Sequence, residues 1–340
     1  MSPTASVIAS PQLHTIASPW LWVATIAGVL ILLVLDFAVT HRPHEVSMRE
    51  AIGWTVFYLA LPVAFGAAIW AGFGSRPGTE FLTGYLLEKS LSVDNLFVFM
   101  LLLSAFAVPA ALAQRVLLYG IAGALVLRGL FIALGAAALA SLDWAFLLFG
   151  AILLITAAKL LVDAAGGQQH DVEVSSMRSV RLLRRVLPVT DDYRGARMTV
   201  REAGRRALTP LALVVTAVMT TDLVFAVDSV PAVYGVTGDP YLVFATNAFA
   251  LLGLRALYFV LQAALSRLVH LAYGLAAILA FIGVKLVLHW AHGIWEGMPQ
   301  IPTLASLGVI VVVLATVTAT SLWATRGSGE SDSTTASSTL

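Results

Sequence analysis

Long apolar stretches bounded by polar residues recur along the whole chain. Each is long enough to cross a bilayer, which takes about 20 largely apolar residues. The stretches are continuously apolar and do not alternate, which favours helices over the strands of a membrane barrel. The pattern predicts an all-α fold, a polytopic transmembrane helical bundle. Its nine predicted helices lie at roughly 20–40, 50–72, 81–106, 115–140, 143–163, 208–234, 240–263, 268–290 and 303–324.

Three of these stretches are followed by three others that carry matching ionisable residues in the same order. EKSLSVDNLFVF, within 81–106, and DLVFAVDSVPAV, within 208–234, each place a carboxylate six residues before an Asp. An Arg and then a Lys follow in both sets, at Arg128 and Lys159 and again at Arg255 and Lys285. Because three is odd, the second set enters the membrane from the opposite side, and we predict a 3+3 inverted repeat, an architecture of secondary transporters.

The repeat suggests a division of the chain into six parts. In order they are N-terminal helices 1 and 2 (1–80), the first three-helix repeat (81–163), a basic loop (164–207), the second three-helix repeat (208–290), the last transmembrane helix (291–325) and a tail (326–340). The tail, RGSGESDSTTASSTL, is polar and rich in Ser and Thr, so we expect it to be disordered.

Composition narrows the function classes. Of 340 residues, 59% are hydrophobic and 11% are charged, against about 25% charged in soluble proteins, which argues against an ordinary soluble enzyme. A net charge of +1 gives no indication of nucleic-acid binding. The absence of Cys excludes disulfides, thiolate metal sites and iron–sulfur clusters.

The charged residues also predict an orientation. Nine Arg lie in 164–207, and the excess of Lys and Arg in cytoplasmic loops places this loop in the cytoplasm. The N-terminus is then outside and the C-terminus cytoplasmic, in the inner (plasma) membrane. Within the loop, Met177–Leu187 predicts a basic helix, either solvated or in contact with anionic lipid head groups. The loop could also bind protein partners.

Ionisable residues within apolar stretches cost about 2.5 to 3.5 kcal/mol each in hydrocarbon and are therefore candidates for function. Five acidic and five basic residues allow structural pairing between helices as an alternative. The ten are Asp36, Glu88, Lys89, Asp94, Arg128, Lys159, Asp222, Asp228, Arg255 and Lys285.

The matching aspartates predict a metal site. Asp94 and Asn95, brought together with Asp228 and Ser229 about a pseudo-twofold axis, supply carboxylate, amide and hydroxyl oxygens. Pro231 cannot donate to the carbonyl of Val227, which becomes a further possible ligand. Oxygen ligands suit a hard divalent cation such as Mn²⁺, Mg²⁺ or Ca²⁺.

Other buried polar residues allow two interpretations. Glu88 and Asp222 either surround the ion, as further ligands, access carboxylates or proton carriers, or pair with Arg128 and Arg255. On a regular helix, residues six apart differ by about 120° around the axis, so Glu88 and Asp94 cannot bind one ion together. The residues assigned to an ion pathway or to structural pairing are Asp36, Arg128, Lys159, Asn247, Arg255 and Lys285.

The stretches EKSLSVDNLFVF, TDLVFAVDSVPAV, TNAFALLGLRALYF and FIGVKLVLH closely resemble the TerC family of integral membrane proteins. The resemblance implies a relative of the LysE-type exporters, with members associated with manganese efflux and others with metal-ion or tellurite resistance. Its acidic motifs fall on Glu88, Asp94, Asn95, Asp222, Asp228 and Ser229. Many members carry a Glu where this chain has Met219, a difference that bears on metal selectivity.

The resulting expectation is a transporter that exports Mn²⁺, or another hard divalent cation, as its transported ion, with no tightly bound cofactor and no enzymatic activity. One alternative is a non-transporting scaffold in tellurite or metal resistance or in metalation of exported proteins. An intramembrane aspartyl protease fits poorly, because its two aspartates are expected in YD and GxGD motifs whereas these lie in VDN and VDS.

Overall fold

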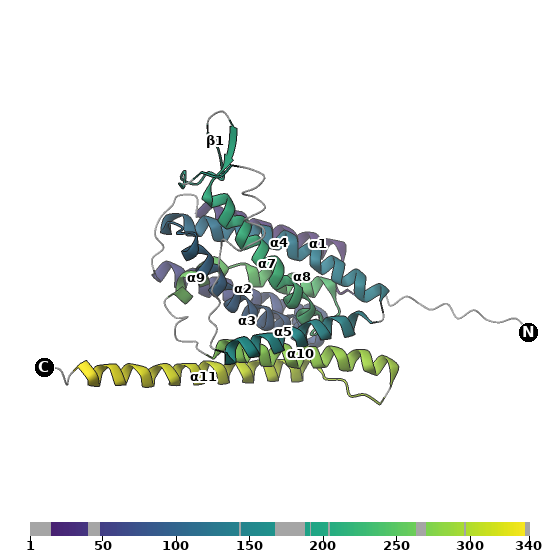
Figure 1. Ribbon diagram of the computed structural model, residues 1–340. Helices are drawn as coiled ribbons and strands as arrows, with labels where there is room; N and C mark the ends of the chain where they lie inside the picture. Colours follow the sequence, from purple (N-terminus) through teal and green to yellow (C-terminus); the bar gives the residue numbers. More distant parts are fainter. Residues whose placement is uncertain are drawn as a thin grey trace, which may run out of the picture.

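The protein is a helical bundle with a small β-hairpin at one end (Figure 1). The computed structural model describes residues 15–39, 48–142, 144–166, 188–190, 192–202, 205–262, 270–295 and 297–336. Its elements are α1 (Pro19–Val39), α2 (Met48–Phe73), α3 (Ser75–Ala105), α4 (Ala110–Ser141), α5 (Ala145–Ala165), β1 (Thr199–Glu202), β2 (Arg205–Leu208), α7 (Pro210–Tyr234), α8 (Pro240–Leu251), α9 (Leu254–Gln262), α10 (Leu271–Ile294) and α11 (Thr303–Ala336).

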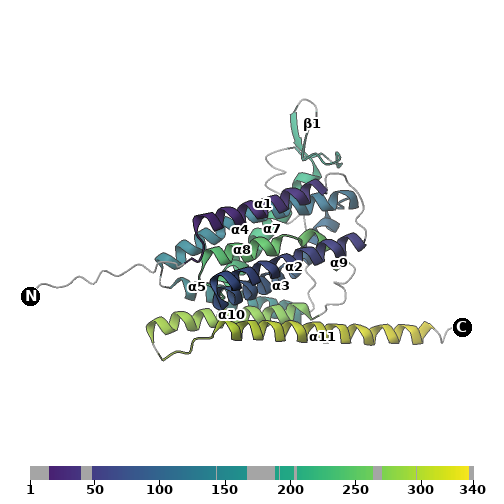
Figure 2. The ribbon, with the colours of Figure 1, turned by 180° about the vertical axis from the view of Figure 1, so that it is seen from behind.

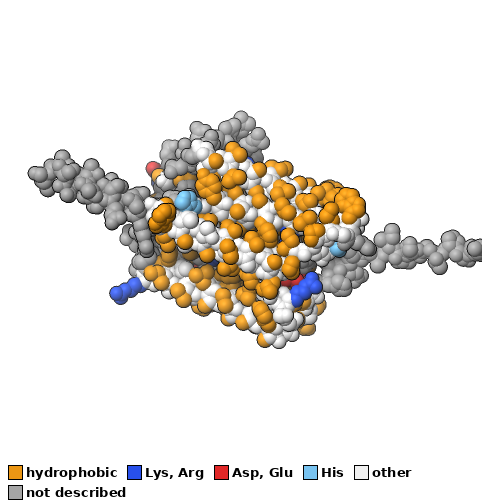
Figure 3. All heavy atoms as spheres, turned by 90° about the horizontal axis from the view of Figure 1, so that it is seen from below, with side chains coloured by type: hydrophobic (Ala, Val, Ile, Leu, Met, Phe, Trp, Pro, Cys, Tyr) orange, Lys and Arg blue, Asp and Glu red, His pale blue; other side chains and the backbone are white. Residues whose placement is uncertain are grey.

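The predicted polytopic helical bundle is confirmed. Seven described helices are long and apolar enough to cross a membrane, and most of the side chains in each apolar window remain outside the core. Figure 3 shows hydrophobic side chains spread over one face, with charged and His side chains toward its two ends. Lipid-facing Leu, Val and Ile are the expected exterior of a bundle whose solvent is hydrocarbon.

The stretch predicted as one helix at 240–263 is two helices. α8 ends at Leu251 and α9 begins at Leu254, and between them Gly253 has a φ of 79°. A side chain is strained at positive φ, and a Cβ at Gly253 would also overlap Tyr58 of α2. The absence of a side chain at position 253 therefore permits both the positive φ and the close approach of Tyr58.

The three helices at 75–165 and the four at 210–294, with α8 and α9 together in the place of one helix, pack in reciprocal pairs. α4 lies against α7, α3 lies against α8, and the longest contact joins α5 to α10. The first helix of each set thus packs on the second helix of the other, and the two third helices pack on each other. This is the packing that a pseudo-twofold relation between the sets produces.

Peripheral elements complete the bundle. α11 lies along one side (Figure 2), and continues to Ala336, past Arg326, where the sequence predicts a disordered tail. Extending an existing helix costs much less than starting one, so α11 continues into a polar sequence. The basic helix predicted at Met177–Leu187 lies outside the described residues.

The hairpin docks on the bundle through its neighbouring loop. β1 and β2 pair antiparallel, with Val200 opposite Ala207, and Leu208 bonds to the backbone at Pro188 and Thr190. The hydroxyl of Tyr193 donates to the carbonyl of Phe106 at 2.8 Å, at the end of α3. Burial raises the pKa of Tyr193, so this donor stays protonated.

Substituting Gly150 with Val is expected to weaken the contact between α5 and α10. A Cβ at Gly150 would lie 2.8 Å from Cγ2 of Val287 and 2.9 Å from the backbone oxygen of Gly283. Because a backbone atom cannot move aside like a side chain, we expect the free energy of unfolding to fall by about 1–3 kcal/mol. Thermal unfolding in detergent measures it. Gly28→Val is the control, because a Cβ at Gly28 has no described neighbour within 4 Å; equal melting of both variants would contradict the close contact.

Candidate functional site

A buried cluster of charged and polar side chains lies where the two halves of the bundle meet. It contains Glu88 from α3, Arg128 from α4, Asp222 from α7 and Asn247 from α8. Each of the four is at most 1% exposed. Two helices of each predicted repeat therefore contribute one side chain apiece to this cluster, which we call the central cluster.

Arg128 bonds to all three other members of the central cluster. Its Nε donates to Oδ2 of Asp222 at 3.0 Å and its Nη2 to Oδ1 at 2.9 Å, a bidentate pair. Its Nη1 donates to Oε1 of Glu88 and, at 3.1 Å, to Oδ1 of Asn247. The amide of Asn247 in turn donates to the carbonyl of Val243 at 2.9 Å. Two carboxylates share one guanidinium, so the central cluster carries a formal charge of −1.

Three buried oxygens on the helix faces that carry the two carboxylates have no hydrogen bond to a described residue. Among the described residues, Oε2 of Glu88, Oγ of Ser92 and Oγ of Ser229 are buried without a hydrogen bond. Ser92 follows Glu88 by four residues and Ser229 follows Asp222 by seven, so each shares a helix face with a carboxylate. Buried polar atoms are normally paired, and these three are unsatisfied acceptors.

The six predicted metal residues do not all lie on the same faces of α3 and α7. Asn95 lies seven residues after Glu88, on the same face, and is 5% exposed. Asp228 lies about 120° around α7 from Asp222 and is half-buried, with an interaction of its own. The side chain of Asp94, at the matching position of α3, is outside those described.

The structure does not arrange the described residues as a finished metal site. No group of three or more His, Asp or Glu side chains in the described ranges is placed to hold a metal ion. α7 runs unbroken through Pro231, and Val227 is exposed on a different part of the helix surface.

A second buried ion pair joins α1 to the core. Arg255 of α9 donates from Nε to Oδ2 of Asp36 at 3.1 Å and from Nη2 to Oδ1. Its Nη1 donates to Oε1 of Gln114 on α4 at 3.1 Å. Asp36 thus forms an ion pair with Arg255, and Glu88 and Asp222 both pair with Arg128 rather than one with each Arg.

The three lysines assigned to the membrane have different environments. Lys89, 8% exposed, donates to the carbonyl of Ala250 at 3.1 Å. That carbonyl is in the last turn of α8, where a positive charge is favourable. Lys285 donates to Ser306 at 3.0 Å, whereas its repeat counterpart Lys159 is exposed on α5.

Sequence reasoning missed several polar residues. Gln114 lies one position before the predicted start of the helix at 115, and Glu80 one position before the predicted helix at 81, so neither was counted inside the membrane. Ser92 lies inside the first motif, between Glu88 and Asp94, but has no polar counterpart, since Ala226 occupies its place in the second set. Its spacing of four from Glu88 is the signal that identifies it.

Met219, the departure from the family pattern, lies one turn before Asp222 on α7. Its side chain occupies the space that a Cβ on Gly123 of α4 would need. It packs against an apolar core cluster formed mainly by α3, α4 and α7. A carboxylate at this position would add a charge within one turn of Asp222.

Comparison with known proteins gives a consistent result. Residues 73–328 match the Integral membrane protein TerC family. The chain is 40% identical over 319 residues to an uncharacterized membrane protein of Myxococcus xanthus, covering 94% of this chain and 97% of the relative. It is 39% identical over 322 residues to an Escherichia coli K12 protein named "Putative membrane-bound redox modulator Alx", covering 92% and 97%. No solved structure matches the chain.

Proposed function

Since the chain belongs to the TerC family of integral membrane proteins, we propose that it is a transporter that exports a hard divalent metal cation, Mn²⁺ in the first instance, from the cytoplasm. The cation passes the level of the central cluster between the two halves of the bundle. Export is driven by the membrane potential or by protons moving the other way on Glu88 or Asp222.

The single observation that carries the proposal is the incomplete compensation of charge in the central cluster. Burying charged groups is expensive unless they are paired, yet here two carboxylates share one guanidinium and Oε2 of Glu88 has no described partner. A purely structural cluster would be more stable with equal numbers of charges. An arriving cation supplies the missing positive charge.

The atoms near Glu88 suit a hard cation. Ser92, Asn95 and Ser229 provide hydroxyl and amide oxygens on the faces that carry the two carboxylates. Such oxygens bind Mn²⁺, Mg²⁺ and Ca²⁺, and there is no thiolate to favour softer metals. For Glu88 to become a ligand with both oxygens, Arg128 must release it while keeping its bidentate bond to Asp222.

The break between α8 and α9 supports transport as well. Discontinuous helices near the midplane are a recurring feature of transporter binding sites, where free carbonyls at the helix end attract cations. In this chain the last turn of α8 already holds a cation, the ammonium of Lys89 on the carbonyl of Ala250. Asn247 of the central cluster lies on α8 three residues before Ala250, so the end of α8 and the central cluster are close.

Export of Mn²⁺ is expected to be lost in Glu88→Gln and Asp222→Asn. Both changes remove a buried charge while keeping shape and hydrogen-bonding capacity, so protein levels should remain near those of the original chain. Cells lacking manganese exporters would express each variant, and cell-associated manganese would be measured after a pulse. Asp163→Asn, which changes a half-buried carboxylate at the end of α5, should export normally.

The same assay separates the two pairs of acidic residues. Normal export by Glu88→Gln and Asp222→Asn, combined with loss in Asp94→Asn or Asp228→Asn, would move the ion to the Asp94 and Asp228 positions. An unaltered manganese content with the original chain, despite normal membrane levels, would contradict manganese export and favour another ion or a non-transporting scaffold. In the scaffold case, partners should be lost when 177–206 is deleted.

The name of the Escherichia coli relative refers to redox modulation. This chain contains no Cys, so a redox effect through its own thiols is excluded. A change in cellular metal content remains the route by which a transporter of this kind would influence redox state.

A further inference from the structure

A cavity of about 950 Å³ opens at the end of the bundle opposite the hairpin. The hairpin precedes the start of α7, whereas Tyr234 and Thr237, at the other end of α7, line the cavity. α3 and α11 begin at the cavity, with Ser75 and Thr303 in its wall. The volume lies within the range of small-molecule sites, about 300–1,000 Å³, and we call it the distal pocket.

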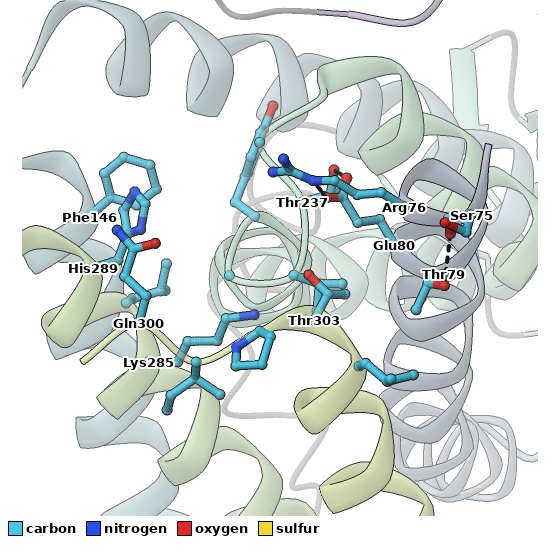
Figure 4. A pocket seen from close by; sticks show the side chains of 18 of the residues that line it. Ser75, Arg76, Thr79, Glu80, Phe146, Thr237, Lys285, His289, Gln300 and Thr303 are labelled. Atoms are coloured by element: carbon cyan, nitrogen blue, oxygen red, sulfur yellow. Dashed lines mark hydrogen bonds and ion pairs between the residues drawn. The ribbon is translucent and has the colours of Figure 1, made fainter. Parts of the chain in front are cut away.

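The charged side chains of the distal pocket come from separate helices (Figure 4). Arg76 and Glu80 project from α3 on one side, and Lys285 and His289 from α10 on the other. Oε1 of Glu80 accepts from Nε of Arg76 at 2.9 Å, and its Oε2 accepts from the hydroxyl of Thr237 at 2.7 Å. Both oxygens of the one carboxylate are therefore already engaged.

The remaining charge of the distal pocket is positive. Two cations, Arg76 and Lys285, face one carboxylate, which leaves a formal charge of +1 with His289 neutral. Neither α3 nor α11 has an acidic residue in its first turn, and no side chain caps α3. Uncompensated helix N-termini favour anions, so they add to the attraction of the two side chains.

The position of the distal pocket indicates which kind of anion it binds. Exposed tryptophans surround this end of the bundle, and Trp and Tyr are enriched at the level of lipid head groups. They lie at the start of α1 and α5 and at the end of α2 and α10, and are Trp20, Trp144, Trp70 and Trp295. Trp70 itself lines the pocket.

We propose that the distal pocket binds the phosphate group of an anionic phospholipid head group, held between Lys285 and Arg76. The side-chain and helix-terminus donors suit phosphate oxygens, and the pocket has room for the glycerol of the head group. The site is separate from the central cluster, so the proposal is independent of cation export.

The test uses the full chain, purified and delipidated in a maltoside detergent. Phosphatidylglycerol with short acyl chains is titrated and bound lipid counted by native mass spectrometry, while inorganic phosphate is titrated in parallel by thermal shift. Phosphatidylglycerol should saturate one site. Lys285→Met should weaken phosphatidylglycerol binding about tenfold, the expected effect of losing a bond to a charged group. Arg76→Gln should also weaken phosphatidylglycerol binding. Because the side chain of Arg76 is exposed, this substitution should not impair folding.

Lys159→Met is the matched control, because Lys159 is the repeat counterpart of Lys285 and lies exposed on α5. It should bind phosphatidylglycerol as the original chain does. Inorganic phosphate binding as tightly as the lipid, with the same dependence on Lys285, would support the phosphate site and identify free phosphate as its source. Binding that is unsaturable, or equal in Lys285→Met and Lys159→Met, would overturn the proposal.

Discussion

Replacing Arg128 with Met is expected to remove most of the folded protein from the membrane. Glu88 and Asp222 would remain buried, at 0% and 1% exposure, without the guanidinium that bonds to both. Removing one partner of a buried ion pair costs about 3–5 kcal/mol, and here two carboxylates lose their partner at once. That is a large part of a typical stability of about 5–15 kcal/mol.

The measurement is the melting temperature and the monodisperse fraction after solubilisation. A triple variant, Arg128→Met with Glu88→Gln and Asp222→Asn, restores electrical neutrality and should recover much of the loss. Recovery would show that the charges, and not the volume of the Arg side chain, dominate. Melting of Arg128→Met at the original temperature would mean that water reaches the carboxylates, in disagreement with their burial.

Asp36→Leu should have the next largest effect on stability. Arg255 is 2% exposed and, of its described side-chain hydrogen bonds, would keep the one to Gln114, so the expected loss of unfolding free energy is again about 3–5 kcal/mol. Because Asp36 links α1 to α9 by an ion pair, α1 should also become more susceptible to proteolysis than α2.

A double-mutant cycle separates the ion pair from local packing. Asp36→Leu with Arg255→Met replaces the pair by apolar side chains, which is often close to neutral, so the double variant should be more stable than either single one. Thermal unfolding of all four proteins gives the coupling energy. Strictly additive losses would show that the two residues do not depend on each other.

Much of the architecture could be predicted because few backbone structures satisfy their own hydrogen bonds in the hydrocarbon of a membrane. The apolar lengths predict the helices, and the order of acid, Arg and Lys predicts which helices correspond. The break at Gly253 could not be predicted, since one Gly in an apolar stretch costs only about 1 kcal/mol and helices tolerate it. Tyr58, which packs against Gly253 at its positive φ, is almost 200 residues away in sequence.

Which charged residues pair with each other also could not be predicted from the sequence. Similar motifs suggest that each Arg serves its own carboxylate, but Arg128 takes both, and Arg255 pairs with Asp36, which lies outside the repeated set. Helical periodicity indicates that Glu88 and Asn95 share a face and that Asp94 does not. The motif alone does not show which of these residues is buried, because that depends on which face of the helix packs against its neighbours.

The break between α8 and α9 bears on the symmetry of the two halves. A break present in one predicted repeat and absent from the other removes their equivalence at that point. α4, the counterpart of α8 and α9, is continuous from Ala110 to Ser141, and the ring of Tyr58 that fills the break belongs to α2, which has no counterpart. The two predicted repeats therefore differ at Gly253, and Tyr58, which packs against the break, belongs to a helix outside both of them.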